Sequence, residues 1–80
     1  MAIVTLYTKP GCHLCDIAKA ALLRVKLDQP FELVEVDIQC DAGLLTEYGL
    51  KIPVVSLNNT VIFEYEVNEA RLRELIKEVN

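Results

Sequence analysis

The chain has 80 residues, of which 52% are apolar, and its eight basic and twelve acidic residues give a net charge of −4. This length fits one domain over residues 1–80, and the acidic balance argues against a nucleic-acid partner. The sequence shows no export signal and no apolar run near the roughly 20 residues that span a bilayer, so we expect a cytoplasmic monomer without a membrane partner.

The first part of the chain predicts a strand, a helix and a second strand. Residues 2–8 are a nearly unbroken apolar run, typical of a strand covered on both faces, and residues 9–11 break it. A helical apolar pattern starts at Leu14 and ends at residues 28–30. Apolar and acidic residues then alternate over residues 34–38, which predicts an edge strand. The expected apolar face of the helix consists of Leu14, Ile17, Ala18, Ala21, Leu22 and Val25.

The middle of the chain predicts a short helix and a hairpin. Asp41 is a suitable cap for a helix that runs to Tyr48, and Gly49 is expected to close that helix in the left-handed conformation. Residues 54–57 and 60–63 are expected to pair as antiparallel strands, because two asparagines between them tolerate positive φ in a tight turn.

The end of the chain predicts a third helix, which Asn68 caps and in which Val67 packs on Leu72. The element order is therefore strand, helix, strand, helix, strand, strand, helix. The first crossover should be right-handed, which makes the first two strands parallel. We predict an α/β protein in which the helices pack on one small mixed sheet.

Cys12 and Cys15 lie three residues apart at the start of the first helix. Free N–H groups and the positive end of the helix dipole favour the thiolate at Cys12, and Lys9 adds a nearby cation. Cys15 lies one turn further in and should be more buried and less ionised. We expect Cys12 to attack a substrate disulfide and Cys15 to resolve the mixed disulfide. An odd count of three cysteines argues against a structural disulfide framework.

Other uses of these cysteines stay open at this point. A zinc site needs four ligands, and only His13 and Cys40 remain as candidates beside the pair, so we expect no bound metal. His13 is interpreted as a solvated residue of the first helical turn, with tuning of Cys12 as the alternative. Cys40 is interpreted as a loop residue without function, with a regulatory or dimerising disulfide as the alternative.

Two segments carry a resemblance to a known family. The whole chain resembles the glutaredoxin-like branch of the thioredoxin superfamily, and most closely its small members with a Cys-His-Leu-Cys motif. The matching segments are Tyr7-Thr8-Lys9-Pro10-Gly11-Cys12-His13-Leu14-Cys15-Asp16 and Tyr48-Gly49-Leu50-Lys51-Ile52-Pro53-Val54. The resemblance implies a thioredoxin-like three-layer α/β/α sandwich of the glutaredoxin type, with a four-stranded mixed sheet in the order β-α-β-α-β-β-α.

The resemblance also implies three substrate-binding residues. Pro53 would follow a cis peptide bond beside Cys12, the backbone of Ile52 would pair with the substrate, and Lys9 would meet a glutathione carboxylate. The chain departs from typical glutaredoxins at Tyr65 and Glu66, which stand near the family's Gly-Gly pair. A side chain at Glu66 is expected to crowd or repel glutathione, which is an anion.

The sequence therefore predicts a thiol–disulfide oxidoreductase that holds no cofactor. Its expected substrates are protein or low-molecular-weight disulfides, and its expected reductant is glutathione or a thioredoxin-reductase-like donor. Two other classes remain as alternatives. One is a module in which Cys12 holds zinc or shares an iron–sulfur cluster across a dimer. The other is a non-catalytic domain that binds peptides beside Pro53.

Overall fold

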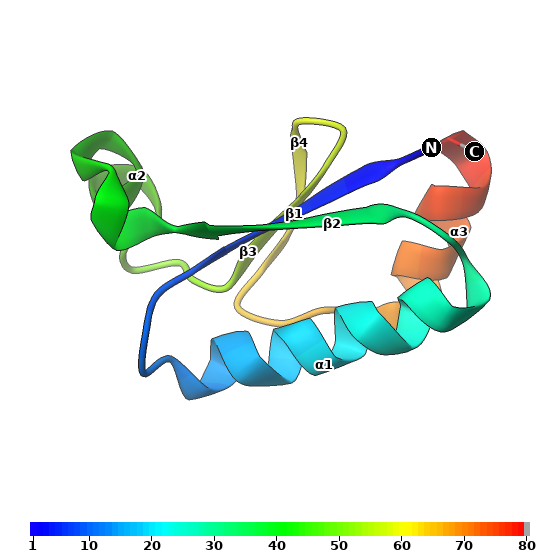
Figure 1. The fold of residues 1–80 in the computed structure, drawn as a ribbon, viewed down its shortest axis with the longest axis horizontal. Coiled ribbons are helices and arrows are strands. Elements are labelled where there is room, and N and C mark those ends of the chain that lie inside the picture. Colours follow the sequence, from blue (N-terminus) through cyan, green and yellow to red (C-terminus); the bar gives the residue numbers. More distant parts are fainter. Residues whose placement is uncertain (80) are drawn as a thin grey trace.

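The computed structural model describes residues 1–79 and contains the seven elements that the sequence predicts, together with one short 3-10 helix (Figure 1). The order confirms the sequence prediction. The elements are β1 (Ile3–Thr8), α1 (His13–Asp28), β2 (Glu32–Asp37), the 3-10 helix η1 (Ile38–Cys40), α2 (Ala42–Tyr48), β3 (Val54–Leu57), β4 (Thr60–Glu64) and α3 (Glu69–Val79).

The four strands form one mixed sheet in the order β2-β1-β3-β4. β1 pairs in parallel with β2 and antiparallel with β3, and β3 pairs antiparallel with β4. The predicted parallel first pair and the predicted edge position of β2 are both confirmed. β2 ends one residue before the alternating pattern does, because the Asp37 side chain accepts from the Gln39 N–H at 2.8 Å and starts η1.

The main core lies between one face of the sheet and the helices α1 and α3. Apolar residues of β1 and β3 pack there against the buried sides of both helices. Phe31, just before β2, also belongs to this core and is 1% exposed. Two salt bridges link α1 to α3. Arg24 of α1 pairs with Glu69 of α3 at 2.9 Å, and Arg73 of α3 pairs with Asp28 of α1 at 2.9 Å. The core residues include Val4, Leu6, Ala18, Leu22, Val25, Val55, Leu57, Leu72 and Ile76.

The buried face of α1 differs from the predicted one. Leu14 and Ile17, which the apolar pattern assigns to the core, are 50% and 52% exposed. The helix instead buries Cys15, Ala18, Ala21, Leu22 and Val25. The thiol of Cys15 occupies a core position of the first turn, and this rotates the helix so that the bulky residues before and after Cys15 face solvent.

The helix α2 lies at one end of the sheet, on the left in Figure 1, away from α3. The Tyr48 ring packs on the ring of Tyr7 from β1, with 4.8 Å between centroids. Tyr7 points to the opposite face from Leu6, because side chains alternate along a strand. α2 thus supplies the third layer only at the end of the sheet where the cysteines lie.

The β3–β4 turn adopts the predicted conformation. Asn58 and Asn59 have φ values of 49° and 72°, as a tight hairpin turn requires. The Asn58 side chain also accepts from the Ile3 N–H at 2.9 Å, which fixes the turn to the start of β1. Asn68 caps α3 by accepting from the Arg71 N–H at 3.0 Å, as predicted.

The prediction of a left-handed Gly49 is wrong. Gly49 has φ −54° and ψ −32°, which is right-handed helical geometry. A glycine is nevertheless required here, because a Cβ atom at this position would lie 2.4 Å from the carbonyl oxygen of Leu45. The reason is the closeness of the preceding turn of α2, whose Leu45 carbonyl accepts from the Gly49 N–H at 2.9 Å, rather than positive φ.

We expect Gly49→Ala to destabilise the protein by about 1–3 kcal/mol, because the added methyl forces the backbone apart. Gly43→Ala is the matched control in the same helix, since its Cβ would meet only the Asp41 side chain, at 3.2 Å. That change should be neutral, or stabilising by up to about 1 kcal/mol. Urea unfolding followed by circular dichroism measures both, and equal effects would contradict the close-approach argument.

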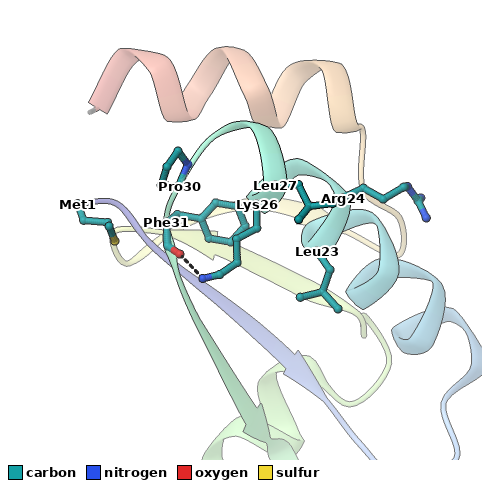
Figure 2. A pocket seen from close by; sticks show the side chains of 7 residues that line it. All are labelled: Met1, Leu23, Arg24, Lys26, Leu27, Pro30 and Phe31. Carbon is teal, nitrogen blue, oxygen red and sulfur yellow. Dashed lines mark hydrogen bonds between the residues drawn. The ribbon is translucent and has the colours of Figure 1, made fainter.

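A cavity of about 510 Å³ lies at the C-terminal end of α1, far along the helix from the cysteines (Figure 2). Leu23 and Leu27 of α1 line it together with Phe31 and Met1. The Lys26 ammonium group donates to the Phe31 carbonyl at 2.8 Å beside it. No cysteine lines this cavity, so Leu27 offers a position for control substitutions away from the thiols.

Candidate functional site

Cys12 occupies the cap position of α1. Gly11 has φ +81°, which lets the chain turn sharply after β1, and the Cys12 N–H donates to the Lys9 carbonyl at 3.3 Å. The Cys12 sulfur accepts from the Cys15 N–H at 3.2 Å. A free helical N–H directed at the sulfur stabilises negative charge on it. The half-buried Cys12 sulfur therefore lies at the N-terminus of α1, with one helical N–H directed at it.

Cys15 is 2% exposed and lies within the first turn of the same helix. Burial raises the pKa of the Cys15 thiol, and the neighbouring Cys12 sulfur raises it further, while hydrogen bonding by Thr8 and the Lys9 backbone acts in the opposite direction. The protonated thiol is therefore the stable form of Cys15 at neutral pH. The two thiols differ in burial, and Cys15 is the more buried one, as the sequence predicts.

An apolar cluster surrounds the buried thiol. Cys15 packs with Ile38 and Ile52, which are far from the cysteines in sequence. The sheet and the segment before β3 bring these residues together. The cluster excludes water from Cys15 and leaves Cys12 at its edge. The partly buried residues packed against the cluster are Tyr7, Cys12, Leu44 and Tyr48.

Ile52 packs with Cys15, and the peptide bond between Ile52 and Pro53 is cis. This confirms the geometry that the family resemblance implies. The sheet ladder of β3 starts at Val54, and no turn or cap hydrogen bond among residues 1–79 uses the backbone of Ile52. Pro53 is fully buried, and its carbonyl accepts from the Tyr65 N–H at 2.8 Å.

The other candidate residues lie at different distances from the thiols. Lys9 is placed next to the pair by its backbone contacts with Cys12 and Cys15. His13 is exposed in the first turn of α1, consistent with a solvated residue. Cys40 is exposed at the end of η1 and forms no disulfide. Among residues 1–79, no three histidine, cysteine, aspartate or glutamate side chains gather as metal ligands.

A groove of about 350 Å³ runs along α1 from the thiol end of the helix. Its helical wall contains the exposed Leu14 and Ile17, and its other wall is the β4–α3 loop, with Tyr65, Glu66 and Val67. Figure 1 shows this loop passing beside α1. The sequence did not indicate the groove, because Leu14 and Ile17 fit the helical core pattern. A pattern centred on Cys15 would have assigned them to the surface.

The unequal thiols predict an order of alkylation. At pH 7, iodoacetamide should modify Cys12 and the exposed Cys40 at least about tenfold faster than Cys15, because burial blocks access and holds the Cys15 thiol protonated. Since its pKa is raised above the usual value of about 8.5, Cys15 labelling should increase only as the pH rises beyond that value. Peptide mass mapping measures each site. Labelling of Cys15 as fast as Cys40 at pH 7 would contradict this assignment.

Comparison with known proteins decides the family. Residues 3–77 match the glutaredoxin-like domain family (DUF836). The chain belongs to this family. An uncharacterised protein of Mycobacterium bovis is 32% identical over 75 residues, which cover 88% of this chain and 77% of that protein. The family assignment agrees with the two motifs around Cys12 and Pro53.

Solved structures confirm the fold. A structural-genomics target from X. campestris superposes with a TM-score of 0.77 at 32% identity, covering 94% of this chain and 96% of that one. A protein of Nitrosomonas europaea gives 0.81 at 24% identity, with 92% and 89% covered. Mitochondrial thioredoxin 3 of Saccharomyces cerevisiae gives 0.68 at 18% identity, with 96% and 77% covered. The protein therefore has a thioredoxin-like fold of the glutaredoxin type.

No helix among residues 1–79 combines the length and the apolar character needed to cross a bilayer.

Proposed function

We propose that this protein is a dithiol thiol–disulfide oxidoreductase. The observation that carries the proposal is the contact between the two cysteines, in which the Cys15 N–H donates to the sulfur of Cys12 at 3.2 Å while the Cys15 side chain is 2% exposed. One sulfur is thus placed to attack and the other to remain protonated until the first has reacted. The glutaredoxin-like family and the fold support the same chemistry.

The reaction takes place in two exchanges. The Cys12 thiolate attacks a disulfide R–S–S–R′, forms a bond to one sulfur and releases the other as a thiolate. Cys15 then loses its proton and attacks the Cys12 sulfur, which releases the second substrate thiol and forms a Cys12–Cys15 disulfide. The substrate gains two electrons and two protons, and the protein loses them. A small thiol such as glutathione, or a thioredoxin-reductase-like enzyme, is the proposed reductant that restores the dithiol.

Ile52 and Pro53 are proposed to position the substrate. The N–H and C=O of Ile52 are free of turn and ladder bonds within residues 1–79 and lie beside the thiols, so an extended substrate segment can pair with them as an added strand. Lys9, whose carbonyl accepts from the Cys12 N–H, is proposed to supply a cation that favours a thiolate and an anionic substrate group. The proposed substrates are protein or low-molecular-weight disulfides.

Reversible oxidation tests the proposal. Mild oxidation should lower the mass of the protein by two hydrogens, peptide mapping should find one bond between Cys12 and Cys15, and dithiothreitol should reverse it. A disulfide that involves Cys40, or no internal disulfide at all, would overturn the dithiol mechanism.

The same sample tests the main rival function. In a zinc or iron–sulfur module, Cys12 would be a metal ligand rather than a nucleophile. Metal analysis of the protein as purified should then find zinc or iron in stoichiometric amount. Protein that contains neither metal and still cycles with dithiothreitol supports the oxidoreductase.

A further inference from the structure

The groove along α1 begins at Leu14, next to the two cysteines of the proposed reactive centre. On one wall, Leu14 lies between the two cysteines in the sequence, and Ile17 follows one turn later. On the other wall, Tyr65 is bonded through its N–H to the carbonyl of Pro53 at 2.8 Å. One wall therefore begins next to both cysteines in the sequence, and the other is bonded to the residue that follows Ile52, which packs with Cys15. A substrate whose sulfur reaches Cys12 can extend its neighbouring residues into this groove.

The groove has apolar walls that the protein itself leaves uncovered. Leu14 and Ile17 are 50% and 52% exposed, and Tyr65 is 53% exposed. Tyr65 has φ +70°, a conformation that a bulky residue rarely adopts. Ala18 and Ala21 also line the groove, and their small side chains leave room for an apolar group from a substrate. Burial of such a group against these residues is favourable.

The charge at the groove is negative. Arg24 and Glu69 both line it, but they neutralise each other, since the guanidinium donates to both carboxylate oxygens at 2.9–3.3 Å. Glu66 is exposed and forms no ion pair among the described residues. Lys9 does not line the groove. An unpaired carboxylate beside apolar walls attracts a cation and repels an anion such as glutathione.

We propose that the groove selects peptide disulfides in which the reacting cysteine is flanked by an apolar side chain and by a lysine or arginine. The apolar side chain lies against Leu14 and Ile17, and the cation pairs with Glu66. This inference rests on the proposed oxidoreductase function and adds a substrate class to it. Glutathione itself is then a poor occupant of the groove.

A set of four short peptides tests the proposal. Each is a symmetric disulfide, so attack on either sulfur gives the same products, and its cysteine is flanked by leucine or serine and by lysine or glutamate. The reduced protein converts each disulfide into two peptide thiols while Cys12 and Cys15 become a disulfide. The initial rate of thiol release is divided by the rate with dithiothreitol, which removes differences in the intrinsic reactivity of the peptides.

The leucine–lysine peptide should react about tenfold faster than the serine–glutamate peptide. We expect about fivefold of this from leucine and about twofold from lysine at low salt. The lysine preference should shrink as salt is added, because the pair with Glu66 is exposed, whereas the leucine preference should persist. The effect of salt therefore distinguishes the contact with Glu66 from the contact with Leu14 and Ile17.

Variants assign each preference to its residues. Glu66→Gln should remove the lysine preference and keep the leucine preference. The double variant Leu14→Ser, Ile17→Ser should remove the leucine preference and keep the lysine preference. Leu27→Ser and Glu78→Gln are exposed controls outside the groove and should keep both. Equal rates for the four peptides, or a faster glutamate peptide, would overturn the substrate class while the oxidoreductase stands. No thiol release from any peptide would overturn both.

Discussion

Replacing Cys12 with serine is expected to reduce disulfide reduction to the uncatalysed rate. The hydroxyl of serine is not ionised near neutral pH, so it cannot replace the thiolate that attacks the substrate. Cys15→Ser should behave differently, because the first exchange needs only Cys12. It should release one thiol per protein and then stop at a mixed disulfide. Turnover should fall by about 10²-fold or more, since an intramolecular resolving thiol acts at high effective concentration.

The third cysteine provides the matched control for both variants. Cys40 is exposed at the end of η1, and Cys40→Ser should leave the rate of disulfide reduction unchanged. Thiol release measured under single-turnover and multiple-turnover conditions distinguishes the three variants. Turnover by Cys12→Ser at the rate of the unmodified protein would contradict the assignment of the nucleophile.

The stalled Cys15→Ser variant also gives access to the physiological substrates. When it is mixed with cell extract, proteins attacked by Cys12 should stay attached to it through a disulfide that dithiothreitol releases. A variant with serine at both Cys12 and Cys15 is the control for non-specific capture. Partners captured by the single variant and absent from the control would identify the disulfides that the protein reduces.

Leu22→Ala is expected to cause a large loss of stability. Leu22 is 0% exposed in the middle of α1 and packs in the core between both helices and the sheet. Truncation of a fully buried leucine costs about 3 kcal/mol, because apolar contacts are lost and a cavity remains. A domain of this size has a total stability of about 4–12 kcal/mol, so the change removes a substantial part of it.

A leucine in the same helix supplies the control. Leu27 is 87% exposed, and Leu27→Ala should change the free energy of unfolding by no more than about 0.5 kcal/mol. Urea unfolding followed by circular dichroism at the helix signal measures both variants. The midpoint should fall for Leu22→Ala with little change in slope. Similar midpoints for the two variants would contradict the assigned packing of α1.

Local features of the sequence predicted most of the fold. Helix caps and tight turns depend on interactions between residues close in the sequence. The sequence alone therefore places the caps at Asp41 and Asn68 and the two-asparagine turn correctly. The parallel pairing of β1 and β2 followed from the general handedness of such crossovers. Gly49 was placed at the correct helix end but with the wrong conformation, because close approach to Leu45 is visible only in three dimensions.

The rotation of α1 is the clearest case in which sequence reasoning was insufficient. The pattern of apolar residues fits a face with Leu14 and Ile17 about as well as a face with Cys15. Which of the two faces is buried depends on the residues from other segments that pack against the first turn of α1. Ile38 and Ile52 form an apolar site that fits the small thiol of Cys15, and the two larger side chains are consequently left to form the groove.

The sequence by itself determined where the two thiols lie along the chain and that a helix starts at them, because caps, breaks and apolar periodicity act between near neighbours. The tertiary structure alone decided which residues bury Cys15, with Ile38 and Ile52 packed against it, and that a groove with an unpaired Glu66 runs along α1 from the thiol end. These features depend on how separate segments pack, and packing fixes the distances between residues that the sequence keeps far apart.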